Sequence, residues 1–96
     1  MKEHAVPTLA LLFGAYFHQD WQIDAMSPLD NVKLFADGEA GSVGAARAEL
    51  DLLLDAGMTE EELREFVVRR LRSFYDPTLV GKRMRTWLEE VRDALS

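Results

Sequence analysis

The 96-residue chain contains no cysteine, which excludes disulfide bonds, thiolate zinc sites and a cysteine nucleophile. It also lacks any apolar run approaching the roughly 18 residues that a membrane-spanning helix needs. Gly38, Gly41 and Gly44 follow no predicted strand, so a glycine-rich phosphate loop has little support. No segment alternates apolar and polar residues between hairpin turns, and a β-sheet is therefore not expected.

Length and composition predict one folded domain over residues 1–96. A chain of this size builds a single hydrophobic core, and 48% apolar with 29% charged residues is typical of a globular protein. The apolar run near the N-terminus follows an acid and a proline and ends without a small-residue cleavage site, so it does not resemble a signal peptide. We expect residues 1–6 to form a flexible tail.

The net charge of −6 is unevenly distributed along the chain. Residues 1–62 hold 12 acidic and 3 basic residues, whereas residues 63–96 hold 5 acidic and 8 basic residues. An acidic surface repels phosphate backbones and attracts basic proteins, so a protein partner is expected and nucleic acid is not. Solubility alone would also account for the acidity.

Apolar residues recur at helical spacing, and the fold class predicted is all-α, a compact bundle of about five helices. The predicted helices cover 7–17, 28–37, a segment between Ser42 and Gly57, a segment after Thr59, and 83–95. Pro7 and Pro28 suit first helical positions, Ser27 and Ser42 are candidate caps, and Thr59 with Glu62 matches a capping box. Gly38 and Gly57 are expected to end their helices. A one-turn helix is expected within 76–82, after a break at Tyr75-Asp76-Pro77.

The fourth predicted helix carries several specific expectations. Glu60 and Arg64, and likewise Glu65 and Arg69, are spaced for ion pairs on its surface. Arg70 lies within its apolar stripe and should either extend outward or pair with an acid such as Asp20 or Asp24. The residues expected to face the core are Leu63, Phe66, Val67, Leu71 and Phe74.

Residues of catalytic type are densest between Leu12 and Trp21. His18, Asp20 and Asp24 are the only plausible metal-binding or acid–base group, but a metal needs further ligands and a core this small leaves little room for a substrate pocket. We therefore favour a structural interpretation, with no metal and no cofactor. In that interpretation Tyr16, Phe17 and Trp21 fill the core, while His18, Gln19 and Asp20 cap the end of the first helix.

Leu52 is a different kind of candidate. When Leu50 is placed at the centre of the inner face of the third helix, Leu52 lies about 200° away, between Asp51 and Asp55. A leucine ringed by carboxylates is suited to anchor a protein partner, and burial against another helix is an equally good explanation.

Several segments, in this order, resemble the helical immunity proteins of bacterial contact-dependent growth inhibition systems. The resemblance is strongest in the Tyr-Phe-His-Gln-Asp-Trp run and extends over nearly the whole chain. The segments are Leu9-Ala10, Leu12 to Trp21, Ala48-Glu49-Leu50 to Leu54, Glu61-Glu62-Leu63, Tyr75-Asp76-Pro77 and Trp87 to Val91.

The resemblance implies a cytoplasmic, non-enzymatic protein that binds and occludes the C-terminal toxin domain of a large effector. Such toxins are often nucleases with basic grooves, which suits an acidic binding protein that is monomeric when free. Since immunity is cognate, the shared Tyr16 to Trp21 run is expected to be scaffold. The expected toxin contacts are Asp30, Asp37, Glu39, Glu49, Asp51, Leu52 and Asp55. The alternatives are a small acidic adaptor or regulatory subunit that binds another basic protein, and a hydrolase or metal-dependent enzyme built on His18 and Asp20.

Overall fold

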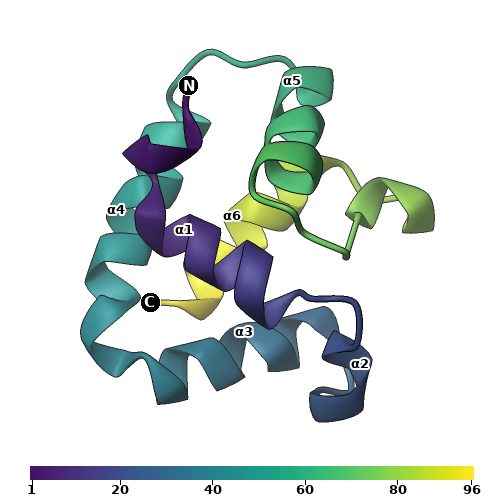
Figure 1. Ribbon diagram of the computed structural model, residues 1–96. Coiled ribbons are helices and arrows are strands. Elements are labelled where there is room, and N and C mark those ends of the chain that lie inside the picture. Colours follow the sequence, from purple (N-terminus) through teal and green to yellow (C-terminus); the bar gives the residue numbers. More distant parts are fainter.

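The computed structural model describes residues 1–96 and confirms an all-α fold (Figure 1). The α-helices are α1 (Pro7–Leu11), α2 (Trp21–Asp24), α3 (Pro28–Gly38), α4 (Val43–Leu54), α5 (Glu60–Arg64) and α6 (Met84–Ala94). π-helical turns continue α1 through Leu12–Tyr16 and α5 through Glu65–Arg70. Short 3-10 turns cover Glu3–Ala5, Ala40–Ser42 and Pro77–Val80, the last confirming the expected one-turn helix. Apart from the short α2, the helical segments match the predicted ones.

Local capping explains where two of the helices begin. The Ser27 hydroxyl accepts a hydrogen bond from the Asp30 amide at 3.1 Å at the start of α3. Thr59 and Glu62 form the predicted capping box at α5, with bonds of 3.1 and 2.8 Å. Ser42 stands at the start of α4, but its side chain makes no capping hydrogen bond, so the prediction of a Ser42 cap is wrong. The preceding 3-10 turn already leads the backbone into α4.

Two glycines near helix ends act for different reasons. Gly57 has a φ of 73°, the left-handed conformation expected after α4. Gly38 is the last residue of α3, as expected of a stop, but its φ is not positive. A Cβ atom on Gly38 would lie 2.9 Å from the Tyr16 hydroxyl, so glycine is needed there for close packing.

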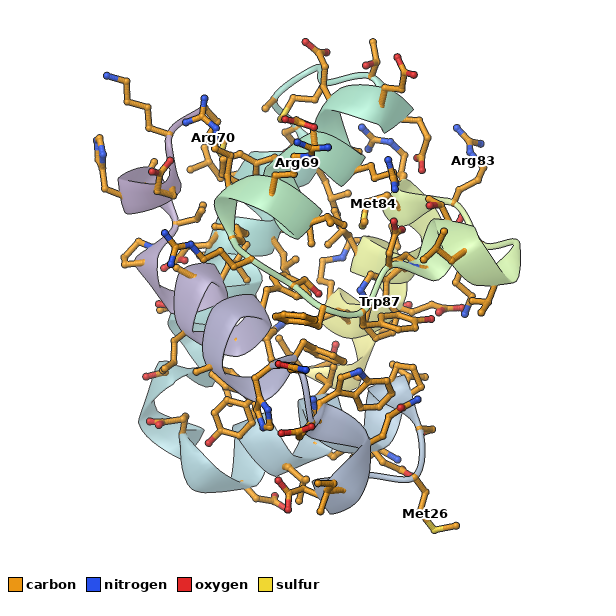
Figure 2. All side chains as sticks on the ribbon, turned by 45° about the vertical axis from the view of Figure 1, so that its right-hand side comes forward. Met26, Arg69, Arg70, Arg83, Met84 and Trp87 are labelled. Atoms are coloured by element: carbon orange, nitrogen blue, oxygen red, sulfur yellow. The ribbon has the colours of Figure 1, made fainter.

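The core is a single cluster of 22 buried apolar residues. Helix α6 runs through the middle of the molecule and packs against α3, α4 and α5. Trp87 of α6 is 1% exposed and lies in the interior (Figure 2). The predicted inner face of this helix is confirmed, since all of its members are buried: Met84, Trp87, Leu88, Val91 and Leu95.

Of two predictions about the segment after α5, one is wrong and one is confirmed in the first of its two alternatives. Phe74 is 64% exposed, because the helix ends before it and Arg72 takes a left-handed φ of 64°, which removes Phe74 from the helical register. Arg70 is exposed, which confirms that its side chain extends outward, and it pairs with Glu3 at 3.4 Å rather than with Asp20 or Asp24.

The expected ion pair between Glu60 and Arg64 is also absent. The Glu60 carboxylate accepts hydrogen bonds from the backbone amides of Met84 and Arg85 at the start of α6. Arg64 instead donates to Asp76 at 2.8 Å. Each side chain therefore binds a partner outside α5: Glu60 binds the start of α6, and Arg64 binds Asp76.

The N-terminal residues meet the rest of the molecule at Val6. Glu3–Ala5 forms one 3-10 turn, and the Val6 side chain is fully buried in the core cluster. No helix in the structure combines the length and the apolar character needed to cross a membrane.

Candidate protein-binding surface

The aromatic residues of the Tyr16 to Trp21 run pack inside the molecule. The Phe17 ring is fully buried, with its centroid 5.5 Å from that of Trp21, 5.9 Å from Tyr75 and 5.8 Å from Trp87. The Tyr16 ring lies edge-on to Phe35 at 5.3 Å. These rings pack the first helical segment against α3, α6 and the Tyr75 segment, so their role is to stabilise the fold.

Of the three polar side chains of the same run, that of His18 bonds to nearby backbone, whereas those of Gln19 and Asp20 make no hydrogen bond, so the prediction that all three cap the helix end is wrong. His18 Nδ1 accepts a hydrogen bond from the Asp20 amide at 3.0 Å, and the His18 carbonyl accepts one from the Trp21 amide at 3.1 Å. His18 and Asp24 line a shallow hollow of about 430 Å³. No group of three or more histidine, aspartate or glutamate side chains is arranged to share a metal ion. The bonds of His18 therefore order the backbone between the first helical segment and α2.

The seven acidic and apolar residues predicted to contact a partner do not form one patch. Helices α3 and α4 meet at a corner and extend as two arms (Figure 1). One group of candidates follows α3, and the other lies near the far end of α4, so the corner separates them. The α3 group is Asp30, Asp37 and Glu39, and the α4 group is Glu49, Asp51, Leu52 and Asp55.

Glu49 is directed into the molecule. Its Oε1 atom accepts hydrogen bonds from the backbone amides of Thr8 at 2.9 Å and Leu9 at 3.0 Å. The first amides of a helix have no partner within that helix, and a carboxylate there also interacts favourably with the helix dipole. One oxygen of the half-buried Glu49 carboxylate thus caps α1 and is bound within the molecule.

The remaining α4 candidates are on the surface. Leu52 is 51% exposed, so burial against another helix does not account for it. Asp51 forms an ion pair with Arg92 at 3.2 Å, whereas Asp55 is exposed and forms no ion pair. One leucine and one unpaired carboxylate remain available on this side.

A larger group of unpaired carboxylates follows α2 and α3, and we name it the α2–α3 edge. Lys33 is the only lysine or arginine between positions 18 and 39, and it too forms no ion pair, so the segment carries a net charge of −4. The edge consists of five acids, none of which takes part in a salt bridge: Asp20, Asp24, Asp30, Asp37 and Glu39.

Asp20 and Asp24 belong to this edge, although the sequence had suggested Asp20 as a helix cap and both residues as metal-binding, acid–base or Arg70-pairing groups, and neither as a toxin contact. The signal that identifies them is present in the sequence, because no lysine or arginine lies within four positions of either residue. Neither carboxylate can therefore form an ion pair with a residue nearby in the sequence.

An apolar groove adjoins the α2 end of this edge, between α2 and the Pro77–Val80 turn. It has a volume of about 500 Å³, and four of its lining side chains are large, apolar and at least 64% exposed. Sequence reasoning missed it, because it placed Phe74 in the core and gave the one-turn helix expected within 76–82 no part in binding. The four side chains are Met26, Phe74, Leu79 and Val80.

Asp76 lies in the floor of the groove and holds this segment in shape. It accepts hydrogen bonds from Arg64 Nε at 2.8 Å, from the Thr78 amide at 3.0 Å and from the Thr78 hydroxyl at 2.6 Å. Burial alone would raise the pKa of Asp76, but these hydrogen bonds and the Arg64 charge outweigh it and hold the pKa below its ordinary value. The carboxylate is therefore ionised at neutral pH.

Comparison with known proteins adds to this geometry. One chain in the crystal structure of a CdiA-CT/CdiI complex from Y. kristensenii 33638 is similar, with a TM-score of 0.88 and 22% sequence identity. The similarity covers 95% of the present chain and 98% of that chain. A search of curated protein sequences finds no match. The family model described as CdiI immunity protein matches residues 5–95, and the chain therefore belongs to the CdiI immunity protein family.

Proposed function

We propose that this chain binds the C-terminal toxin domain of a cognate contact-dependent growth inhibition effector and neutralises it. Membership of the CdiI immunity protein family supports the proposal, as does the similarity to a chain in a structure named as a CdiA-CT/CdiI complex. The protein acts by binding inside the cell that makes it, and no catalysis is involved.

The α2–α3 edge is the surface that we propose binds the toxin domain. Its five carboxylates form no ion pair within the molecule, so their charge is directed to the solvent and to a partner. Surface charge of one sign steers a partner of the opposite sign and raises its association rate. A toxin domain with a basic surface fits this edge.

A basic surface of this kind is what a nuclease needs around its active site, because its substrate carries a phosphate at each nucleotide. We propose that the toxin is a nuclease and that the α2–α3 edge covers its substrate groove. Carboxylates such as Asp24, Asp30 and Asp37 then take the place of substrate phosphates and exclude the nucleic acid.

The α4 group is the competing location. It offers Leu52 as an apolar anchor and Asp55 as an unpaired charge, whereas Asp51 is already bound to Arg92. The α2–α3 edge is favoured because all five of its acids are without an ion pair.

The test is titration of the purified cognate toxin domain with the purified protein. Nucleic acid cleavage should fall to background at an equimolar ratio. The complex, once denatured and separated, should release toxin that regains activity on refolding, since binding leaves its covalent structure intact. Undiminished cleavage at a large excess of the chain would contradict the proposal, and permanently inactive toxin would indicate a modifying enzyme.

A further inference from the structure

Four of the five most exposed large apolar side chains of the molecule line the groove between α2 and the Pro77–Val80 turn, and the fifth is Ile23 of α2. Met26 is 98% exposed on one wall, and Leu79 and Val80 are 78% and 71% exposed on the other. Figure 2 shows Met26 extending from the surface at one end of the molecule. Scattered apolar residues on a surface need no explanation, but a contiguous group along a groove marks an interaction site.

The segment that presents these side chains is tied to the core. The Phe74 amide donates to the Phe17 carbonyl at 2.9 Å, and the Ser73 amide donates to the Val67 carbonyl at 3.1 Å. The Ser73 hydroxyl donates to the Tyr75 carbonyl at 2.8 Å. Phe74 therefore projects from a hydrogen-bonded backbone, and presenting it costs little ordering when a partner binds.

The backbone at Arg72 gives a second indication that the outward position of Phe74 is a built feature. Arg72 has a φ of 64°, which is unfavourable for a residue with a side chain and persists only where the surrounding structure holds it. This residue ends the helical register after α5. A continuing helix would instead carry Phe74 back toward the core.

Phe74 and Leu79 form a ridge between two hollows. Both line the groove beside α2, and both also line a second hollow of about 500 Å³ with Arg64 and Arg72. Asp76 contributes to both hollows, and its bonds to Arg64 and Thr78 fix the base of the ridge. The surface thus offers an apolar projection with recesses on either side.

We propose that this groove and ridge are the apolar anchor site for the cognate toxin domain, which inserts an apolar side chain that has a lysine or arginine next to it. This inference rests on the proposed function, and it names the surface at which the toxin domain is bound. Charge identifies the occupant, because Asp20 lies between the lining residues Gln19 and Trp21 and forms no ion pair. A basic partner matches that rim, whereas a second copy of this acidic chain would bring carboxylates toward one another.

An apolar contact at the centre with charges at the rim is the arrangement in which a few residues supply most of the binding energy. The groove supplies the apolar centre, and the α2–α3 edge supplies the charged rim. The dissociation rate is then set mainly at the groove, and the association rate is set mainly at the edge.

The test compares two leucines that are both exposed but lie on different sides of the molecule. Leu79→Asp should weaken binding to the toxin domain by about 30-fold or more, the range of a central anchor residue, measured by calorimetric titration. Leu52→Asp on α4 makes the same chemical change and should alter the affinity by less than about threefold, as expected outside such a centre. Circular dichroism and thermal melting confirm that each variant is folded.

Met26→Asp on the opposite wall gives a second measurement and should also weaken binding. Wild-type affinity in both Leu79→Asp and Met26→Asp would overturn the anchor site while leaving the proposed function intact. Loss of binding in Leu52→Asp alone would overturn it in favour of the α4 group. Self-association that Leu79→Asp abolishes, seen by sedimentation, would identify a second copy as the occupant and also overturn it. A wild-type protein that does not bind the toxin would overturn both proposals.

Discussion

The α2–α3 edge and the segment from α5 to α6 use their charges in opposite ways. Every one of the five salt bridges has its basic member between Arg64 and Arg92, whereas no acid of the α2–α3 edge takes part in one. Figure 2 shows Arg69 and Arg70 at the opposite end of the molecule from Met26, which follows α2, although the two regions meet where the Pro77–Val80 turn borders α2 and where α6 packs against α3. Charge in the first region is left for a partner, and charge in the second holds the fold.

Helix ends show the internal use of charge most clearly. Glu60 of α5 binds the first amides of α6, and the Arg85 side chain donates to the Leu54 carbonyl at the end of α4 at 3.1 Å. Glu49 of α4 binds the first amides of α1. In each case a charged side chain meets the helix end whose partial charge is opposite to its own.

The largest effect is expected when the charge of the α2–α3 edge is reversed. Asp20→Lys combined with Asp24→Lys should lower affinity for the toxin domain by about 100-fold at low salt, mainly through a slower association rate. The loss should shrink at high salt, where exposed charges are screened. Surface-based kinetic measurements at two salt concentrations check this prediction.

Asp51→Lys combined with Asp55→Lys is the matched control, with the same change in net charge on the α4 side. It should change the affinity by less than about fivefold, as expected of charges outside the contact region. If this control lost more affinity than the Asp20→Lys, Asp24→Lys variant, the interface would lie on α4, and the α2–α3 edge would not be the region whose charge is left for a partner.

The next largest effect concerns stability and the Asp76 carboxylate. Asp76→Ala leaves the Thr78 amide without its acceptor and Arg64 Nε with only the Thr78 hydroxyl, and should lower the free energy of unfolding by about 2 kcal/mol at neutral pH. Urea unfolding measures this difference. Glu89→Ala removes an exposed acid that forms no ion pair and should leave stability within about 0.5 kcal/mol of wild type.

The same variant tests the pH dependence. Because the pKa of folded Asp76 is held below its ordinary value, its contribution is complete above the unfolded-state pKa of about 3.9 and is lost as pH falls through the folded-state pKa. The difference between wild type and Asp76→Ala should therefore narrow in acid. A difference that stays constant from neutral pH into strong acid would show that the ionised carboxylate is not what holds this segment.

Features that depend on residues close in sequence were predictable. The Ser27 cap, the Thr59–Glu62 capping box and the left-handed Gly57 each involve positions within four residues, and all three are confirmed. The inner face of α6 followed from helical spacing alone. The fold class was accessible for the same reason.

Features that depend on distant residues were not predictable. Glu49 and Thr8 are 41 positions apart, and nothing near Glu49 indicates that its carboxylate caps α1. The excess of acids in the first two thirds of the chain was visible, but which acids remain unpaired depends on the packing of the helices. Phe74 was misplaced because the left-handed Arg72 breaks a periodicity that the sequence continues.

A smaller effect is expected at the internal cap of α1. Glu49→Ala removes the acceptor of the Thr8 and Leu9 amides and should lower the free energy of unfolding by about 1 kcal/mol, as for other lost caps. Toxin affinity should stay near the wild-type value, because the carboxylate faces the molecule. Glu39→Ala should give the opposite pattern, with stability retained and toxin binding weakened. Equal effects on both measurements in the two variants would remove the distinction between internal and outward charge.

The smallest effect is expected for the ion pair between Glu65 and Arg69. The pair measures 3.4 Å, and its side chains are 61% and 76% exposed, so water competes with it and ordering two long side chains offsets its attraction. A double-mutant cycle with Glu65→Ala and Arg69→Ala should therefore give a coupling of about 0.3–0.5 kcal/mol, as for exposed pairs at this spacing. A coupling above about 1 kcal/mol would mean that surface pairs stabilise this fold as much as its helix caps do. Surface ion pairs in the second region would then contribute as much to stability as the charged side chains that bind helix ends.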